Sequence, residues 1–170
     1  ATLKGRAVWL CVNLFAAILA SRVIVFFADS IEQMVALAVL MPVVASMGGN
    51  AGSQSMAVTV RALATRDLTA QNALRVVRRE VAVGALNGLL FGGILATITG
   101  VWFGVPMLAV VIGIALFLTL VSAAFAGIMV PIGLERFGID PALASGPLVT
   151  TMTDIVAFFT FLGLASWVLL

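Results

Sequence analysis

The sequence predicts an all-α integral membrane protein with five transmembrane helices, and three observations support this. Hydrophobic residues make up 63% of the 170 residues and charged residues only 9%, far from the balance of a soluble domain. The apolar residues form five stretches, each long enough for the roughly 20 residues that cross a bilayer core. Charged side chains gather mostly at the ends of these stretches and between them. The whole chain, 1–170, is therefore interpreted as one membrane domain.

The first two predicted helices cover about 7–27 and about 31–60. The first contains a single charge, Arg22, near its far end. The second is unusually long, and we expect Pro42 and the pair Gly48-Gly49 to break it, because proline removes a backbone donor and glycine loosens a helix. A polar connector with five arginines follows (Arg61, Arg66, Arg75, Arg78 and Arg79).

The last three predicted helices cover about 81–103, 106–130 and 142–170. A short charged turn with Glu135, Arg136 and Asp140 precedes the fifth helix. Small residues line one face of the third helix (Gly84, Gly88 and Gly92) and of the fourth (Ser122, Ala123, Ala126 and Gly127). Such stripes favour close helix packing over a hinge or a pore face. We expect Asn87, beside the first stripe, to hydrogen-bond a neighbouring helix.

The basic residues predict the orientation of the chain in a plasma (inner) membrane. If the first helix leaves the cytoplasm, every Lys and Arg except Arg22 lies on the cytoplasmic side. The positive-inside rule then puts the N-terminus in the cytoplasm and the C-terminus outside. Trp9, Trp102 and Trp167 fall near predicted helix ends, where an aromatic belt belongs.

Composition also excludes several functions. A net charge of only +2, with the arginines spread over helix ends, argues against a nucleic-acid surface. Cys11 is the single cysteine and histidine is absent, so zinc and copper sites lack their usual ligands. We expect Cys11 to serve only in packing.

Asp154 is the most informative residue, because it is the only acid deep inside a hydrophobic segment. An ionised side chain at mid-membrane costs about 2.5–3.5 kcal/mol on insertion scales. The chain offers no basic residue at that depth, so the natural partner is a cation. Thr150 lies one helical turn earlier on the same face, and its hydroxyl or carbonyl could join a metal site. The neighbouring threonines are expected to bond their own helix. The sequence therefore predicts a cation pathway.

The second helix carries a matching polar stretch, from Pro42 through Gly48-Gly49-Asn50-Ala51-Gly52-Ser53-Gln54. Irregular backbone at membrane depth is tolerated only inside protein or beside water. An environment rich in oxygen ligands, without thiol or imidazole, suits hard cations such as Mg²⁺ and Ca²⁺.

With its Thr-rich last helix and Asp154, this motif resembles the membrane domain of the MgtE magnesium channels over essentially all 170 residues. The resemblance implies a homodimer with its pore on the two-fold axis, lined by the second and fifth helices of both chains. Two copies of Asp154 would form the selectivity ring for a largely hydrated Mg²⁺. The pore-lining residues it implies are Gly48, Gly49, Asn50, Gly52, Gln54, Pro147 and Thr151. The family's cytosolic regulatory part has no counterpart here, so we expect this chain to be a piece of a larger protein.

Three other readings stay open. A proton- or sodium-coupled carrier would use Asp154 as its coupling site. An intramembrane aspartyl protease needs two carboxylates that share a proton, and one chain places only one at depth, so we expect no enzyme. A purely structural anchor would not need the polar stretch in the second helix.

Overall fold

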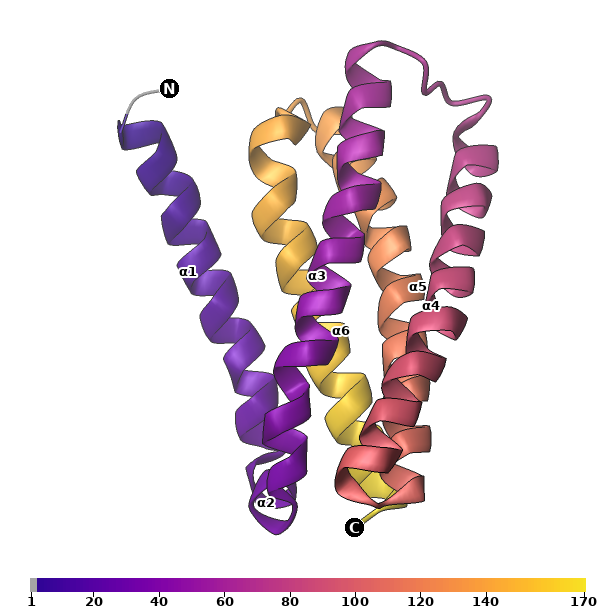
Figure 1. The fold of residues 1–170 in the computed structure, drawn as a ribbon. Coiled ribbons are helices and arrows are strands. Elements are labelled where there is room, and N and C mark those ends of the chain that lie inside the picture. The colour runs from indigo at the N-terminus through magenta and orange to yellow at the C-terminus, as the bar shows by residue number, and fades with distance from the viewer. Residues whose placement is uncertain (1–2) are drawn as a thin grey trace.

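The computed structural model describes residues 3–170, which form six α-helices and no β-strand (Figure 1). Five of these helices are long and apolar enough to cross a membrane: α1 (Leu3–Phe26), α3 (Val35–Ala64), α4 (Ala73–Phe103), α5 (Pro106–Arg136) and α6 (Pro141–Val168). The sixth, α2 (Ala28–Gln33), is a short helix of six residues after α1. The predicted all-helical chain with five apolar spans is confirmed.

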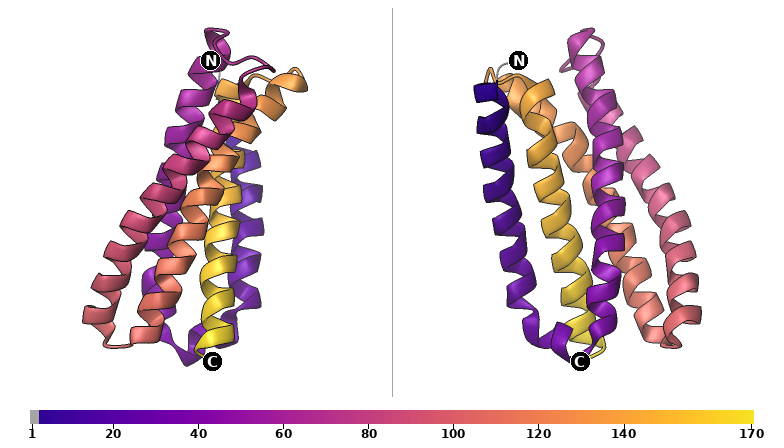
Figure 2. Two further views of the ribbon diagram at one scale, coloured as in Figure 1. Left: turned by 90° about the vertical axis from the view of Figure 1, so that its right-hand side faces the viewer. Right: turned by 60° about the vertical axis from the view of Figure 1, so that its left-hand side comes forward.

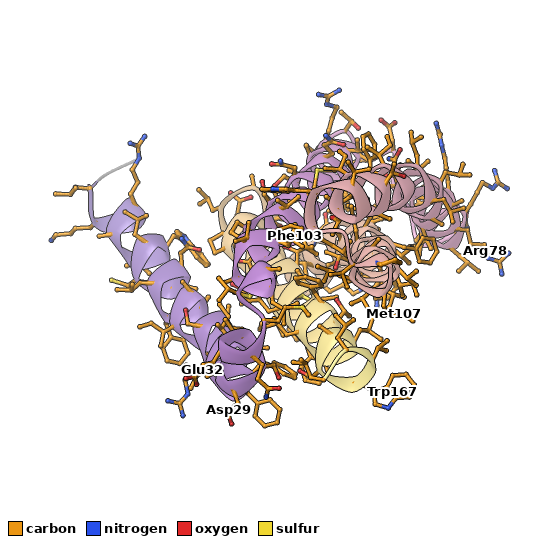
Figure 3. All side chains as sticks on the ribbon, turned by 60° about the horizontal axis from the view of Figure 1, so that its bottom comes forward. Asp29, Glu32, Arg78, Phe103, Met107 and Trp167 are labelled. Carbon is orange, nitrogen blue, oxygen red and sulfur yellow. The ribbon has the colours of Figure 1, made fainter. Side chains whose placement is uncertain are left out.

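Consecutive long helices run in opposite directions, which gives the bundle two distinct ends (Figure 1). The basic end holds the start of α1, the α3–α4 loop with Arg66 and the α5–α6 turn after Arg136. The distal end holds α2, the α4–α5 turn and the C-terminus. Figure 3 views the distal end, with Asp29 and Glu32 on α2. Charge therefore lies mainly at the rims of the bundle, as expected for membrane helices.

Two helices extend beyond their predicted apolar segments at the basic end. α4 begins at Ala73 rather than near 81, and α5 ends at Arg136 rather than near 130. The extra turns of α4 carry Arg75, Arg78 and Arg79, all exposed. Hydropathy detects only the apolar part of a helix that crosses the membrane. A helix can extend beyond that part where its charged side chains reach water.

The expected break in the second predicted helix is wrong, because α3 is continuous from Val35 to Ala64. The helix runs without interruption through Pro42 and through Gly48-Gly49. Proline costs only the bond that its missing N–H would donate to the carbonyl of Ala38, four residues earlier. In an apolar surrounding every other backbone group gains from staying paired, which outweighs the poor helix propensity of glycine.

α5 is the central helix, packed against α3, α4 and α6. The largest buried cluster joins the first half of α3, the first half of α5 and the second half of α6, all near the distal end (Leu37, Leu40, Val44, Leu108, Ile112, Leu116, Ala157 and Phe161). Such large side chains fill the distal half of the bundle. Where α3 crosses α5 and α6 further toward the basic end, Gly48, Gly52 and Gly127 allow closer contacts.

The glycine stripe of α4 packs against α5, as the sequence predicts. A Cβ atom added to Gly84 would lie 2.8 Å from the Cβ of Ala124, and one added to Gly92 would lie 2.8 Å from the carbonyl oxygen of Gly113. Real Cβ atoms do not approach so closely, so only glycine permits this contact. Asn87, in contrast to the prediction, makes no hydrogen bond to another described residue and is exposed.

α1 is the peripheral helix of the bundle. It packs mainly on α6, burying Ala16 and Ala20, and its other side chains are mostly exposed, Cys11 among them. The expectation that Cys11 is a packing residue inside the chain is therefore wrong. α1 and α3 are joined through α2 at the distal end and separate toward the basic end (Figures 1 and 2).

Candidate functional site

Asp154 lies at the middle of α6, thirteen residues after Pro141 and fourteen before Val168. At about 1.5 Å per residue, it is about 20 Å from either end of the helix. Its side chain is half-buried, and no hydrogen bond joins it to another described residue. An acid at this depth without a protein partner is costly to keep ionised. The position is therefore suited to a ligand that brings positive charge.

The threonines around Asp154 bond their own helix, as predicted. The Thr151 hydroxyl donates to the carbonyl oxygen of Pro147 at 2.6 Å, and the Thr153 hydroxyl donates to that of Thr150 at 2.9 Å. The Thr150 side chain is exposed and makes no such bond. Pro147 has no N–H, so the carbonyl of Leu143 also lacks its partner within the helix. Thr150 and Leu143 thus offer free oxygen atoms on the approach to Asp154.

A cavity of about 660 Å³ leads toward Asp154 from the basic end, between α1 and α6. From α6 it is lined by Leu143, Gly146, Pro147 and Thr150, so it ends one helical turn before the carboxylate. Arg6, Trp9 and Asn13 of α1 line its other wall. The sequence analysis did not assign α1 to the site. Asn13, a lone amide in an apolar segment, was the one signal that pointed to it.

The glycine motif of α3 divides between two faces of the helix. Gly48 and Gly52 are buried against α5 and α6: an added Cβ would lie 2.6 Å from Thr119 Cγ2 at Gly48 and 2.8 Å from Val149 Cγ1 at Gly52. Gly49 has no atom within 4 Å of such a Cβ, and Asn50 is exposed. Within one protomer, the first two glycines therefore hold α3 against its neighbours, and the others face outward.

Gln54 belongs to a different neighbourhood from Asp154. It lines a pocket between α3 and α4 together with Ser55, Glu80 and Asn87. The structure thus brings Pro147 and Thr150 together on the side of Asp154 that faces the basic end, and it keeps Gln54 apart from them. Glu80 was not singled out by the sequence analysis, because it stands among arginines at the start of an apolar segment.

One protomer does not contain a complete metal cage. No group of three or more His, Cys, Asp and Glu side chains gathers within residues 3–170. Asp154 supplies one carboxylate, and α6 offers hydroxyl and carbonyl oxygens beside it. Oxygen-only coordination of this kind suits a hard cation that keeps much of its water. Apolar helices around an unpaired central carboxylate are the features of an α-helical membrane transport protein.

Comparison with known proteins identifies the family. Residues 41–164 match the MgtE family model, described as a divalent cation transporter. The chain is 38% identical over 165 residues to the magnesium transporter MgtE of Thermus thermophilus (97% of this chain), and 36% identical over 161 residues to that of Bacillus subtilis (95%). The magnesium transporter MgtE of Enterococcus faecalis is 34% identical over 161 residues (95%). The chain belongs to the MgtE family, which confirms the resemblance found in the sequence.

The matched region covers 36% of the length of each of these three relatives. The relatives are thus considerably longer than this chain. What the whole proteins transport and how they are controlled are therefore matters of proposal for the present chain.

Proposed function

We propose that this chain is the ion-conducting membrane part of a magnesium transporter, which passes largely hydrated Mg²⁺ down its electrochemical gradient. The observation that carries the proposal is the unpaired carboxylate of Asp154 at the centre of α6. Membership of a divalent cation transporter family and the names of the three relatives support the choice of ion. Nothing in this role calls for catalysis.

The conducting form is a homodimer with α3 and α6 of both protomers around the pore. Support comes from the exposed face of α3, which carries the polar side chains of Ser46, Asn50 and Ser53. On the same face, no atom lies within 4 Å of a Cβ added to Gly49. Polar side chains on a membrane helix normally face the bundle interior or water rather than lipid. A two-fold partner covering this face would line the passage with polar groups and a smooth glycine surface.

Two copies of Asp154 near the dimer axis would match the double charge of Mg²⁺. Mg²⁺ is small and releases water reluctantly, so it is usually held through several waters. The carboxylates would then act at water-mediated distance, together with the oxygen atoms of the exposed Thr150. A double charge gains about 4.6 kcal/mol per 100 mV across the membrane, twice the single-charge value, so inward flow needs no further coupling.

The direction of flow follows from the proposed orientation. The arginines of the basic end support an orientation with that end in the cytoplasm and with α2 and the C-terminus outside the plasma membrane. Asp29 and Glu32, exposed on α2, would then face the outer solution, where they would raise the local cation concentration (Figure 3). The cavity between α1 and α6 would open toward the cytoplasm. The greater length of the relatives leaves room for a cytosolic regulatory part.

The test is the substitution Asp154→Asn, which keeps size and hydrogen bonding but removes both charges of the proposed ring. Because the carboxylates act through water, Mg²⁺ affinity should fall by about ten- to a hundredfold, as it does when outer-shell ligands are lost. Na⁺ should pass more readily once no divalent ion blocks the site. Asp154→Glu should retain part of the function. Flux or current measured with Mg²⁺ and with Na⁺ alone gives both quantities.

The matched control is Asp29→Asn, which removes the same charge from an exposed position on α2. It should change Mg²⁺ affinity only slightly. If Asp154→Asn instead leaves Mg²⁺ affinity intact, the selectivity ring lies elsewhere. If wild-type transport demands a proton or sodium gradient and Asp154→Asn uncouples it, the protein is a carrier with Asp154 as coupling site.

A further inference from the structure

A second polar site lies between α3 and α4, on another side of α3 from Asp154. α3 contacts α6 through Gly52, whose added Cβ would meet Val149 and Thr153. Ser55, three residues further along α3, lies against Gly127 of α5, bonds Glu80 of α4 and lines a pocket of about 190 Å³. Gln54 of α3 and Glu80 and Asn87 of α4 line the same pocket. The body of α3 therefore separates this pocket from the cavity that approaches Asp154.

The polar groups of the pocket are all oxygen ligands for a hard cation. Glu80 contributes a half-buried carboxylate, Ser55 a hydroxyl, and Gln54 and Asn87 each an amide oxygen. The Ser55 hydroxyl donates to Glu80 Oε2 over 3.4 Å, a long bond that leaves most of the carboxylate's capacity unused. Asn87 has no hydrogen-bond partner among the described residues. Four oxygen ligands on two helices thus line one space, and the long Ser55–Glu80 bond is the one hydrogen bond among them.

No basic side chain lines this pocket. Arg75, Arg78 and Arg79 precede Glu80 on α4, but all three are exposed, and Figure 3 shows Arg78 pointing away from the bundle. A carboxylate drawn in between two apolar helices costs free energy unless a positive charge or hydrogen bonds compensate it. The pocket therefore holds a negative charge with room beside it and no protein cation.

A cation bound in this pocket would lie between two helices that pack only weakly against each other. α4 is held to α5 by the close contacts at Gly84, Gly88 and Gly92, whereas α3 and α4 share few contacts with each other. Nothing but the Ser55–Glu80 bond joins their polar side chains within residues 3–170. A cation between them would join α3 to α4 directly, in addition to the contacts that each helix makes with α5.

We infer that this pocket is a second divalent-cation site, in which Glu80 binds a largely hydrated Mg²⁺ with Ser55, Gln54 and Asn87 as oxygen ligands or water-mediated partners. At about 30 Å³ per water, 190 Å³ accommodates about six waters, the hydration shell that Mg²⁺ prefers to keep. The ion links α3, the helix that carries the glycine motif, directly to α4, beside the packing of α3 on α5 and α6. This site does not depend on Asp154 or on the proposed pore.

The experiment uses Mn²⁺ as a paramagnetic probe that shares the oxygen preference of Mg²⁺. In the full-length protein with Cys11→Ser and any other cysteine removed, a nitroxide is attached at Leu86→Cys. Leu86 is two-thirds exposed and adjacent to Asn87, so the label reports on the pocket without filling it. Mn²⁺ should broaden the spectrum of this label, and excess Mg²⁺ should reverse the broadening.

Three substitutions in that background decide the result. Glu80→Gln should shift the Mn²⁺ midpoint of broadening by at least about tenfold, as loss of the only carboxylate predicts. Glu135→Gln removes an exposed carboxylate at the same end of the bundle and should leave the midpoint unchanged. Asp154→Asn should also leave it unchanged, which separates this site from the proposed pore.

Two outcomes would overturn the inference. If the spectrum of the Glu80→Gln variant broadens at the same Mn²⁺ midpoint as that of its parent, while circular dichroism shows a folded protein, then Glu80 binds no divalent ion. If Asp154→Asn removes the broadening and Glu80→Gln does not, the label reports the central site only. A label at Leu14→Cys on α1, which is also exposed but on the far side of α3, should be insensitive to Glu80→Gln in either case.

Discussion

The two faces of α3 both carry glycine, but only the inner face needs glycine for packing inside the protomer. On the inner face, Gly48 and Gly52 are buried, and an added Cβ would meet α5 or α6 at 2.6–2.8 Å. On the outer face, Gly49 meets nothing within 4 Å and stands among exposed polar side chains. The inner glycines are needed because a neighbouring helix is already there. At the outer glycine the protomer leaves room for a side chain, so packing inside the protomer does not require a glycine there. Within one motif, Gly48 thus serves the packing of the protomer, whereas the adjacent Gly49 is available for the proposed conduction.

The largest expected effect is loss of transport from Gly49→Leu. The side chain would enter the proposed passage, so Mg²⁺ flux should fall to the background of empty vesicles. The free energy of unfolding should not decrease, since the position is open in the protomer and leucine has a higher helix propensity than glycine. Flux in reconstituted vesicles and thermal unfolding in detergent measure the two quantities.

The control for Gly49→Leu is Gly93→Leu, the same change at a glycine of α4 that is also open. It should leave flux near the wild-type level. Equal loss of flux in both variants would mean that any bulky residue on a membrane-facing surface disturbs the protein, and the distinction between the two faces of α3 would fail.

The next effect in size is loss of stability from Gly48→Ala. Its Cβ would lie 2.6 Å from Thr119 Cγ2, and Thr119 is fully buried with its hydroxyl bonded to the Ala115 carbonyl at 2.7 Å. Thr119 cannot rotate without breaking that bond, so overpacking should cost about 1–3 kcal/mol of unfolding free energy. Gly49→Ala, one residue away, should cost less than about 0.5 kcal/mol. Equal losses in the two variants would contradict the assignment of faces.

The smallest effect is a partial rescue by a second substitution. Thr119→Ser removes the methyl group that an alanine at position 48 would strike, and it keeps the hydroxyl that bonds Ala115. Combined with Gly48→Ala, it should restore at least half of the lost stability, a coupling of about 0.5–1.5 kcal/mol in a double-mutant cycle. Additive losses in the double variant would place the strain of Gly48→Ala somewhere other than Thr119.

Hydropathy predicted the five long helices because a bilayer imposes the same demand on each of them: enough apolar length to cross and every backbone group paired. It predicted neither helix ends nor neighbours. α4 begins well before its apolar segment because arginines are solvated there, and α3 stays helical through Pro42. Hydropathy also could not predict that α5 is the central helix and α1 the peripheral one, because lipid and the protein interior select equally apolar side chains.

The candidate site was predictable in part. A lone acid in an apolar segment is a signal that depends on energy alone, so Asp154 was identified and its place at mid-helix followed from counting residues. The side on which each motif residue lies was not predictable. Gly48 and Gly49 are adjacent in sequence but about 100° apart around the helix, and only the positions of α5 and α6 decide which one is buried. Gln54 likewise shares a pocket with Glu80 rather than with Asp154, because α4 crosses on that side.

The attachment of α1 to α6 has a consequence for biosynthesis. The first long helix to be made docks mainly on the last one, so it must wait in the bilayer while α3, α4 and α5 are inserted. Only about a tenth of its most apolar window is buried in the bundle, so α1 can stay in lipid as an independent span during that interval. The cavity between α1 and α6 therefore forms only when α6 arrives, and ribosomes halted before α6 should carry a chain whose α1 is still free to diffuse away from the bundle.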